Sequence, residues 1–327
     1  FVLTVDPVND APVIEDIASQ EMDEDTTLDI TLSASDVDDG TGSGDENDLS
    51  FSAESDNAAI SVDVTGDELT ITPDADYYGG GTITVTVTDM GSRLEDETSF
   101  DVTVNNVNDA PVLTDIGSQS TDEETPITAL SVNFTDADIH DPSDTHTITV
   151  ESSSPSDVVV ENLSGDVSGS TYDLVPSTDF HGDVEITVTV TDSGTDNLTD
   201  VEVYTLTVTP VNDAPVMTAI DPQSTSEEMP LTITVSSTDV DTGTGAGDEN
   251  VPTYSAVSSD SGDVAVTVDG DQLTMTPSLD FHGDVEITVT VTDDGGLSDD
   301  TDFVLTVDPV NDAPVIEDIA SQEMDED

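Results

Sequence analysis

The sequence predicts an all-β chain, built as tandem seven-stranded antiparallel Greek-key β-sandwiches stacked end to end as a rod. Two observations lead to this prediction. Apolar and polar residues alternate with a period of two in many short runs, as at Ile83, Val85 and Val87, which stand between threonines. The hexapeptide Val-Asn-Asp-Ala-Pro-Val also occurs four times, at 8–13, 107–112, 211–216 and 310–315. The steps of 99, 104 and 99 residues suit a row of independently folding domains.

The strands of the first unit follow from composition as well as alternation. Val, Ile and Thr favour strands, and clusters of Asp, Gly, Asn and Pro between the runs indicate turns. No segment shows a sustained helical period with caps. The last strand ends in alternating apolar residues, and a short linker stiffened by proline leads to the next unit, which favours a rod. The seven expected strands are 13–17, 27–34, 49–53, 59–64, 68–72, 82–88 and 99–104.

The repeats set the expected domain boundaries. Residues 1–10 are interpreted as the last strand and linker of a preceding repeat, and 313–327 as the start of a fourth. Three full repeats lie between them, at 11–109, 110–213 and 214–312. Residues 1–25 and 303–327 are identical, at an offset of 302. We therefore expect this chain to be one period of a longer array.

Charge excludes several kinds of partner. The chain has 76 Asp plus Glu but a single basic residue, Arg93. Binding to a nucleic-acid backbone needs clustered Lys and Arg, and anionic membrane surfaces attract basic segments, so both partners are excluded or disfavoured. No apolar run approaches the ~18–20 residues needed for membrane insertion. Cysteine is absent, which removes disulfides and thiolate metal sites. No nucleophile–base motif recurs, so we predict that the chain is not an enzyme.

Acidic residues recur at fixed positions of each repeat: after the first strand, as Asp-x-Asp after the second, before an aromatic residue, after the sixth strand, and in the hexapeptide. Because neighbouring strands run in opposite directions, these turns separate onto two poles, and each junction gathers acids from two domains. The positions are Glu24, Glu123 and Glu227; Asp36, Asp38, Asp136, Asp138, Asp239 and Asp241; Asp76, Asp179 and Asp280; Asp89, Asp192 and Asp293; and Asn9, Asp10, Asn108, Asp109, Asn212, Asp213, Asn311 and Asp312.

Crowded carboxylates need a counter-charge. Two like charges ~4 Å apart repel by about 4 kcal/mol at an effective dielectric constant of 20. With one arginine in the chain, metal ions must supply the compensation. Hard oxygen ligands in a cluster of six to eight select Ca²⁺ over zinc or copper. Calcium would neutralise only a small part of the net charge of −75, so we interpret the remaining acids as solubilising surface charge.

These motifs resemble a cadherin repeat, specifically the bacterial cadherin-like tandem repeats of giant secreted RTX-type biofilm adhesins. The resemblance rests on the Glu after the first strand, the Asp-x-Asp, the Asp that ends the sixth strand and the Asn-Asp-Ala-Pro linker, and it covers all three full repeats. It implies up to three Ca²⁺ ions that lock each junction. The ligands it implies are Glu24, Asp76, Asn108, Asp109, Asp136, Asp138 and Asp192 at the first inner junction, and Glu123, Asp179, Asn212, Asp213, Asp239, Asp241 and Asp293 at the second.

Two departures from the family pattern leave the number of ions open between two and three. The glutamate that is common at the aromatic turn is replaced by Tyr78, His181 and His282. The acid that usually precedes Asn-Asp in the family is replaced by Asn105 and Thr209 at the inner junctions. Loops 38–48 and 241–250 are acidic and Gly-rich but do not fit an EF-hand, and we favour unstructured loops over further ion sites. His181 and His282 are expected to be surface residues rather than zinc ligands.

The resemblance implies a structural extender, exposed on the outside of a bacterial cell, that projects a distal adhesive domain. Its partners would be calcium ions and the neighbouring repeats, in a monomeric rod. The alternative is a module for carbohydrate binding or for homophilic cell–cell adhesion. Sugar platforms usually need exposed aromatic rings, and the chain has no Trp and twelve Phe plus Tyr, most of them in strands or core turns.

Overall fold

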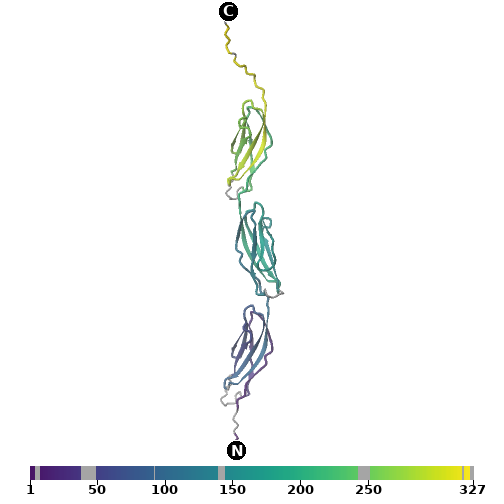
Figure 1. The fold of residues 1–327 in the computed structure, drawn as a ribbon. Coiled ribbons are helices and arrows are strands. Elements are labelled where there is room, and N and C mark those ends of the chain that lie inside the picture. The colour runs from purple at the N-terminus through teal and green to yellow at the C-terminus, as the bar shows by residue number, and fades with distance from the viewer. Residues whose placement is uncertain are drawn as a thin grey trace.

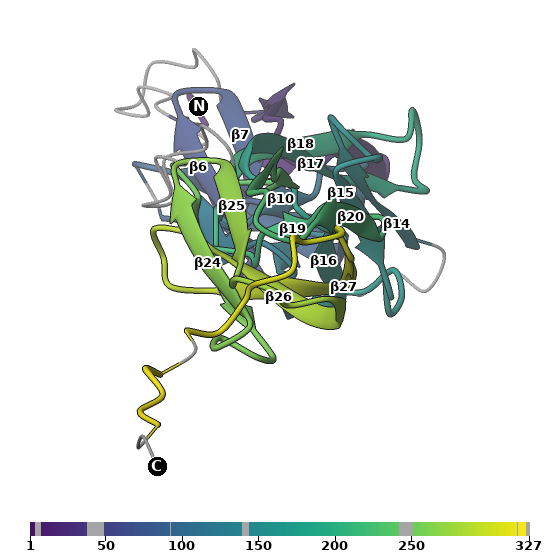
Figure 2. The same cartoon turned by 90° about the horizontal axis from the view of Figure 1, so that it is seen from above.

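Three β-sandwich domains follow one another along a line, with the two termini at opposite ends of the molecule (Figure 1). The computed structural model describes residues 1–3, 8–37, 49–91, 93–138, 144–241, 251–318 and 320–324. All regular elements within these ranges are strands, so the predicted all-β class is confirmed. Across the same ranges no helix has the length and apolar character to cross a membrane. Viewed along the long axis the domains overlap, as end-to-end stacking requires (Figure 2).

In the first domain, a four-stranded sheet in the order β2-β9-β8-β5 faces a three-stranded sheet in the order β3-β7-β6, and β1 pairs with β4. The bounds are β1 (Val13–Ile14), β2 (Gln20–Asp23), β3 (Leu28–Thr31), β4 (Ala34–Ser35), β5 (Leu49–Ser55), β6 (Ile60–Thr65), β7 (Glu68–Pro73), β8 (Gly79–Asp89) and β9 (Glu95–Asn105).

The other two domains repeat this topology, with sheets β11-β18-β17-β14 and β12-β16-β15, then β20-β27-β26-β23 and β21-β25-β24. The second domain has β10 (Val112–Leu113), β11 (Gln119–Asp122), β12 (Ile127–Val132), β13 (Phe134–Thr135), β14 (His146–Ser152), β15 (Val158–Glu161), β16 (Ser170–Pro176), β17 (Gly182–Asp192) and β18 (Thr199–Thr209). The third has β19 (Val216–Met217), β20 (Gln223–Ser226), β21 (Leu231–Thr234), β22 (Ser237–Thr238), β23 (Thr253–Ser258), β24 (Val264–Asp269), β25 (Gln272–Pro277), β26 (Gly283–Thr292) and β27 (Ser298–Asp308).

One strand pair per domain departs from the predicted antiparallel arrangement. The expected first strand, 13–17, ends after Ile14, and the chain then crosses to the other sheet, where β2 pairs in parallel with β9. The pair is parallel because β2 and β9 both run toward the next domain. Sequence reasoning missed β2 because its residues, Gln20–Asp23, hold a single buried apolar side chain, Met22. The switch carries the following residue, Glu24, to the junction.

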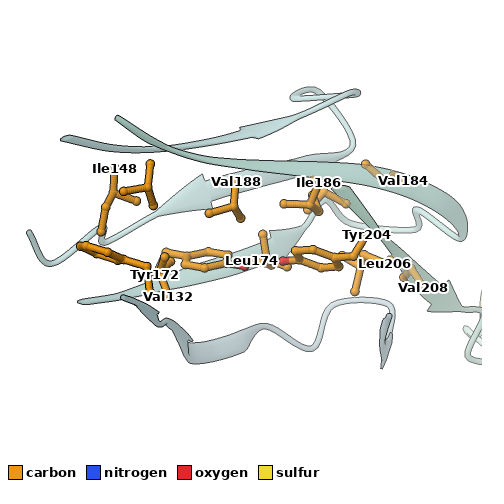
Figure 3. Close-up of a cluster of buried hydrophobic side chains, with 13 residues drawn as sticks. Val132, Ile148, Tyr172, Leu174, Val184, Ile186, Val188, Tyr204, Leu206 and Val208 are labelled. Atoms are coloured by element: carbon orange, nitrogen blue, oxygen red, sulfur yellow. Dashed lines mark hydrogen bonds between the residues drawn. The ribbon is translucent and has the colours of Figure 1, made fainter. Parts of the chain in front are cut away.

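The alternating residues of each repeat meet between the two sheets. In the second domain the buried cluster includes Leu174, Ile186 and Leu206, all fully covered. Figure 3 shows Tyr172 and Tyr204 pointing toward each other within this cluster, and their hydroxyl oxygens are 2.5 Å apart in a hydrogen bond. Burial is the largest cause that raises the pKa of both phenols. The pair therefore stays neutral and satisfies its own polar groups.

A recurring acid on the last strand of each domain is structural. Asp96 Oδ2 accepts the backbone N–H of Ile14 at 3.0 Å, and so ties β1 to β9. The equivalent hydrogen bonds, both 2.8 Å long, hold the first strands of the other domains. Their acceptors are Asp200, which binds Leu113, and Asp299, which binds Met217. These acids orient the strand that follows each linker.

Candidate metal centres at the domain junctions

Glu24 is the buried anchor of the first inner junction. It follows β2 directly, is only 2% exposed, and its Oε1 accepts the N–H of Val107 in the linker at 2.6 Å. One ligand atom from each of Glu24, Asp109 and Asp138 lies within 4.8 Å of the others. These three residues come from the first domain, the linker and the second domain. The fold therefore gathers carboxylates from two domains around one linker, as the strand directions predicted.

Two buried oxygens of this cluster have no hydrogen-bond partner: Glu24 Oε2 and Asp109 Oδ2. The other contacts of the cluster fix the backbone, since the N–H of Asp109 donates to Asp138 Oδ2 at 2.8 Å. A buried, unpaired carboxylate oxygen is costly. Among the residues that the structure describes in this cluster none carries a positive charge, and the donor set of carboxylate oxygens fits a cation.

A second cluster lies beside the first and shares Asp109 with it. One ligand atom from each of Asp25, Asp76 and Asp109 lies within 4.8 Å of the others. Asp25 and Asp76 both have left-handed backbone, with φ of 56° for each, and the N–H of Asp76 donates to Asp25 Oδ1 at 3.3 Å. Such backbone is unfavourable for residues other than glycine and is found at functional turns. Asp109 therefore belongs to both clusters.

Sequence reasoning missed Asp25. The signal was present, because an acid follows each recurring glutamate, and all three of these acids, Asp25, Glu124 and Glu228, have positive φ. Sequence reasoning assigns only the first acid of each pair, Glu24, Glu123 and Glu227, to the site. The turn that places Glu24 inward also places Asp25 over Asp76, which tertiary structure alone reveals.

Desolvation and mutual repulsion act on these carboxyls. Burial is the main cause that raises the pKa of Glu24, and the charges of Asp138 and Asp109 raise it further, against the hydrogen bond from Val107. Burial also leads the causes that raise the pKa of Asp109, followed by the charges of Asp76 and Asp138. Without a counter-ion the junction thus disfavours its own charged form.

Asn108 and Asp192 meet across the same junction. Asn108 Nδ2 donates to Asp192 Oδ2 at 3.1 Å and to the carbonyl of Thr195 at 3.2 Å. Asp192 Oδ1 accepts the N–H of Leu198 at 3.0 Å. This pair links the first linker to the turn between β17 and β18. Asp136 lies near Asp109, because both line one cavity and the charge of Asp136 is among the causes, after burial, that raise the pKa of Asp109. Its Oδ1 accepts the N–H of Asp138 at 2.9 Å, and its Oδ2 faces His146.

The second inner junction repeats the arrangement. Ligand atoms of Glu123, Asp213 and Asp241 lie within 4.8 Å of one another. Glu123 Oε1 accepts the linker N–H of Val211, and Asp241 Oδ2 accepts the N–H of Asp213 at 2.6 Å. Burial leads the causes that raise the pKa of Asp213, followed by the charges of Asp241 and Asp179. The predicted members thus surround one linker carboxylate.

The remaining predicted members of this junction follow the first one. Asn212 Nδ2 donates to Asp293 Oδ2 at 3.0 Å, and Asn212 Oδ1 is buried without a hydrogen-bond partner. Asp239 Oδ1 accepts the N–H of Asp241 at 3.0 Å, so this Asp-x-Asp has the same local turn as Asp136 and Asp138. The charge of Glu124 also raises the pKa of Asp213, which matches the position of Asp25 at the first junction.

The outer junctions are more open. Asn9 Nδ2 donates to Asp89 Oδ2 at 3.0 Å, next to the exposed Asp10, and Glu227 Oε1 accepts the N–H of Val310 at 2.5 Å. Asp36 follows β4 at the same pole as Asp89, whereas Asp38 lies outside the described residues. At the other end, three exposed acids have ligand atoms within 4.8 Å, and Asn311 donates to the carbonyl of one of them. These acids are Glu228, Asp280 and Asp312.

Two other predicted features have different outcomes. The loop predictions for 38–48 and 241–250 fall outside the described residues except at Asp241. His181 is half-buried and His282 is exposed, and neither belongs to a metal-competent cluster of the described residues. Histidine does join such a cluster at another position, His146, which sequence reasoning did not single out.

Comparison with known proteins agrees with this architecture. The model of the bacterial Ig domain family (Big_9) matches residues 9–105 and 212–306, which together make up more than half of the chain. The chain belongs to the bacterial Ig domain family. The matched segments are the first and third domains, and the second domain of this bacterial Ig chain repeats their sheet order. None of the curated proteins matches the sequence.

Solved structures similar to this bacterial Ig chain are cadherin ectodomains. A protocadherin gammaB7 fragment comprising EC3-6 is 22% identical, with a TM-score of 0.54, over 91% of this chain and 74% of that one. Mouse cadherin-23 EC22-24 is 18% identical, with a TM-score of 0.54, over 93% of this chain and all of that one. At such identities the likeness concerns the fold, and it confirms cadherin-like tandem repeats.

Proposed function

We propose that this chain is a structural extender segment of a large secreted bacterial adhesin, made rigid by Ca²⁺ at its domain junctions. In this role it lies outside the cell and holds a distal adhesive domain away from the surface. The family, the cadherin-like row of domains and the acidic junctions support the proposal. The observation that carries it is the pair of buried, unpartnered oxygens of Glu24 and Asp109, in a cluster whose described members, Glu24, Asp109 and Asp138, are all acidic.

The residues present fit calcium better than other metals. Every ligand atom of the clusters around Asp109 and Asp213 is a carboxylate oxygen, which is what hard cations prefer. Glu24, Asp109 and Asp138 would hold one ion, and Asp25, Asp76 and Asp109 a second. A bound cation would supply the positive charge that offsets the repulsion. Because each set takes ligands from two domains or their linker, loading it would fix the angle between the domains.

Small-angle scattering of the full chain tests the proposal. In millimolar Ca²⁺ we expect a stiff particle with the maximum dimension of a row of three domains. EGTA should reduce that dimension or broaden its distribution, because repulsion at the junctions would no longer be neutralised. An equally stiff particle in EGTA would refute the mechanism.

Matched variants locate the effect. Asp138→Asn should loosen the first inner junction, and Asp241→Asn should loosen the second, since each removes the equivalent carboxylate. Asp67→Asn is the charge control, because Asp67 is exposed in the β6–β7 turn at the opposite pole of the first domain. A loss of stiffness in Asp67→Asn equal to that in Asp138→Asn would mean that net charge, and not the site, sets the shape.

A further inference from the structure

An Asp-x-Gly sequence recurs at the turn that follows β8, β17 and β26. Its glycines are Gly91, Gly194 and Gly295. The aspartate of the motif orders the turn: Asp192 Oδ1 accepts the N–H of Gly194 at 3.2 Å, and Asp89 Oδ1 accepts the N–H of Gly91 at 2.9 Å. The calcium proposal uses the aspartate of this motif and gives its glycine no role.

Backbone conformation does not require the glycines of the two inner junctions. Neither Gly194 nor Gly295 lies in the left-handed region of φ, where the lack of a Cβ makes glycine the favoured residue. The next residue, Gly296, does lie there, with φ of 91°, and a Cβ built on it would meet open space. What distinguishes Gly194 and Gly295 is therefore the space around them.

The asparagine of the linker fills that space. A Cβ built on Gly194 would stand 1.5 Å from Oδ1, 2.2 Å from Cγ and 2.9 Å from Nδ2 of Asn108. On Gly295 it would stand 2.4 Å from Cγ and Oδ1 and 2.5 Å from Nδ2 of Asn212. Non-bonded carbon atoms pack at about 3.5–4.0 Å, so rotating the amide about its own bond does not remove the overlap.

Hydrogen bonds from the same turn hold each asparagine against its glycine. Asn108 Nδ2 donates to Asp192 Oδ2 and to the carbonyl of Thr195. Asn212 Nδ2 donates to Asp293 Oδ2 in the same way. To make room for a Cβ, the asparagine would have to rotate at χ1 and give up these bonds. The turn therefore binds the asparagine by shape as well as by hydrogen bonding.

Other contacts fasten the same stretch of the first linker to the second domain. The N–H of Asp109 donates to Asp138, and the N–H of Leu113 donates to Asp200, both at 2.8 Å. These contacts, like that of Asn108, join protein to protein. The stretch 108–113 therefore belongs to the domain that follows it, and its orientation sets the direction in which that domain continues the rod.

We propose that Gly194 and Gly295 are positioning residues of the rod, each leaving the space in which a linker asparagine docks on the following domain. This docking needs no ion. The inference rests on the proposed role of the chain as a stiff extender, and it adds a second determinant of the angle between domains. A junction that keeps all its carboxylates should still become loose when its glycine is replaced by alanine.

A double-mutant cycle in EGTA tests the docking without bound ions. In the full chain, Gly194→Ala should lower the Tm of the transition that involves the second domain by about 4–8 °C, because the asparagine loses its bonds to Asp192 and Thr195. In the Asn108→Ala background the same change should shift Tm by less than about 2 °C, since no amide then fills the space.

Gly262→Ala is the matched control. The backbone of Gly262 is also outside the left-handed region, but a Cβ there would meet no atom closer than 3.4 Å, so its Tm should stay within about 2 °C of the wild type. Gly295→Ala with and without Asn212→Ala repeats the cycle at the second junction. Equal falls of Tm in both backgrounds would overturn the proposal, because the glycine would then serve only its own turn. No fall in either background would also overturn it.

Small-angle scattering in Ca²⁺ gives a readout of shape. Gly194→Ala should reduce the maximum dimension or broaden its distribution, whereas Gly262→Ala should keep the wild-type value. Full stiffness in Gly194→Ala would overturn the positioning role.

The docking and the calcium proposal fail separately. If EGTA has no effect on the rod but the coupling between positions 108 and 194 is present, the calcium proposal fails and the docking stands. A rod that depends on calcium but shows no such coupling removes the role of the glycines alone.

Discussion

Replacing Asp109 by asparagine should have opposite effects with and without calcium. Asp109 is the residue shared by the two clusters of the first inner junction, where it lies with Glu24 and Asp138 on one side and with Asp25 and Asp76 on the other. Asparagine keeps the size and the backbone N–H that binds Asp138, and removes only the charge. The sign of the effect thus reports on electrostatics and not on packing.

The distances set the magnitude. Two unit charges 4.8 Å apart, the limit for atoms in these clusters, repel by about 3.5 kcal/mol at an effective dielectric constant of 20. Salt, solvent and partial protonation reduce this, since the pKa of Asp109 is raised by burial and by its acidic neighbours. We expect the variant to be about 1–3 kcal/mol more stable than the wild type in EGTA. In calcium the variant should lose at least about 1.4 kcal/mol of stability, which corresponds to tenfold weaker binding of one ion.

Thermal unfolding of the full chain measures both values. For a domain of this size, 1 kcal/mol shifts Tm by about 4–8 °C, so Asp109→Asn should raise the Tm of the transition that involves the junction in EGTA and lower it in calcium. Asp67→Asn, the charge control at the other pole, should shift neither by more than about 1 °C. A fall of Tm of equal size in both conditions would refute the electrostatic argument, because Asp109 would then act only as a structural residue.

Two further predictions concern pH and the core of the second domain. The pKa values of Glu24, Asp109 and Asp213 are raised above their ordinary values of 4.5, 3.8 and 3.8, mainly by burial. At a pH between the ordinary and the raised pKa, the folded chain therefore binds more protons than the unfolded chain. In EGTA its Tm should therefore rise as the pH falls from 7 toward those ordinary values, and a falling Tm would contradict this. Tyr204→Phe leaves the hydroxyl of Tyr172 without its partner and should cost about 1–3 kcal/mol in urea unfolding. Adding Tyr172→Leu, which restores the Leu and Phe pairing of the first domain, should recover part of that loss, and no recovery would show that the lost hydrogen bond is not the cause.

The calcium-type clusters were accessible to sequence reasoning because the chain is repetitive. An acid that recurs at one position of every repeat can be distinguished from the many solvated acids, and the direction of the strand before it places it at one pole of the domain. This reasoning placed Glu24, Asp109 and Asp138 together, as they lie in the structure. It did not find Asp25, whose part depends on a left-handed turn. Nor did it find His146, which occurs in a single repeat, so no recurrence marked it.

Sequence alone determined the all-β class, the repeat and the two poles, because alternation with a period of two and recurring turns are local properties of the chain. Only the tertiary structure decided how the first strand divides, since a parallel pair between β2 and β9 joins residues about 80 apart. That pairing brings Glu24 onto the N–H of Val107 and leaves its second oxygen buried and unpaired. Whether an acid is solvated or needs a cation depends on such burial, which arises from contacts between distant segments.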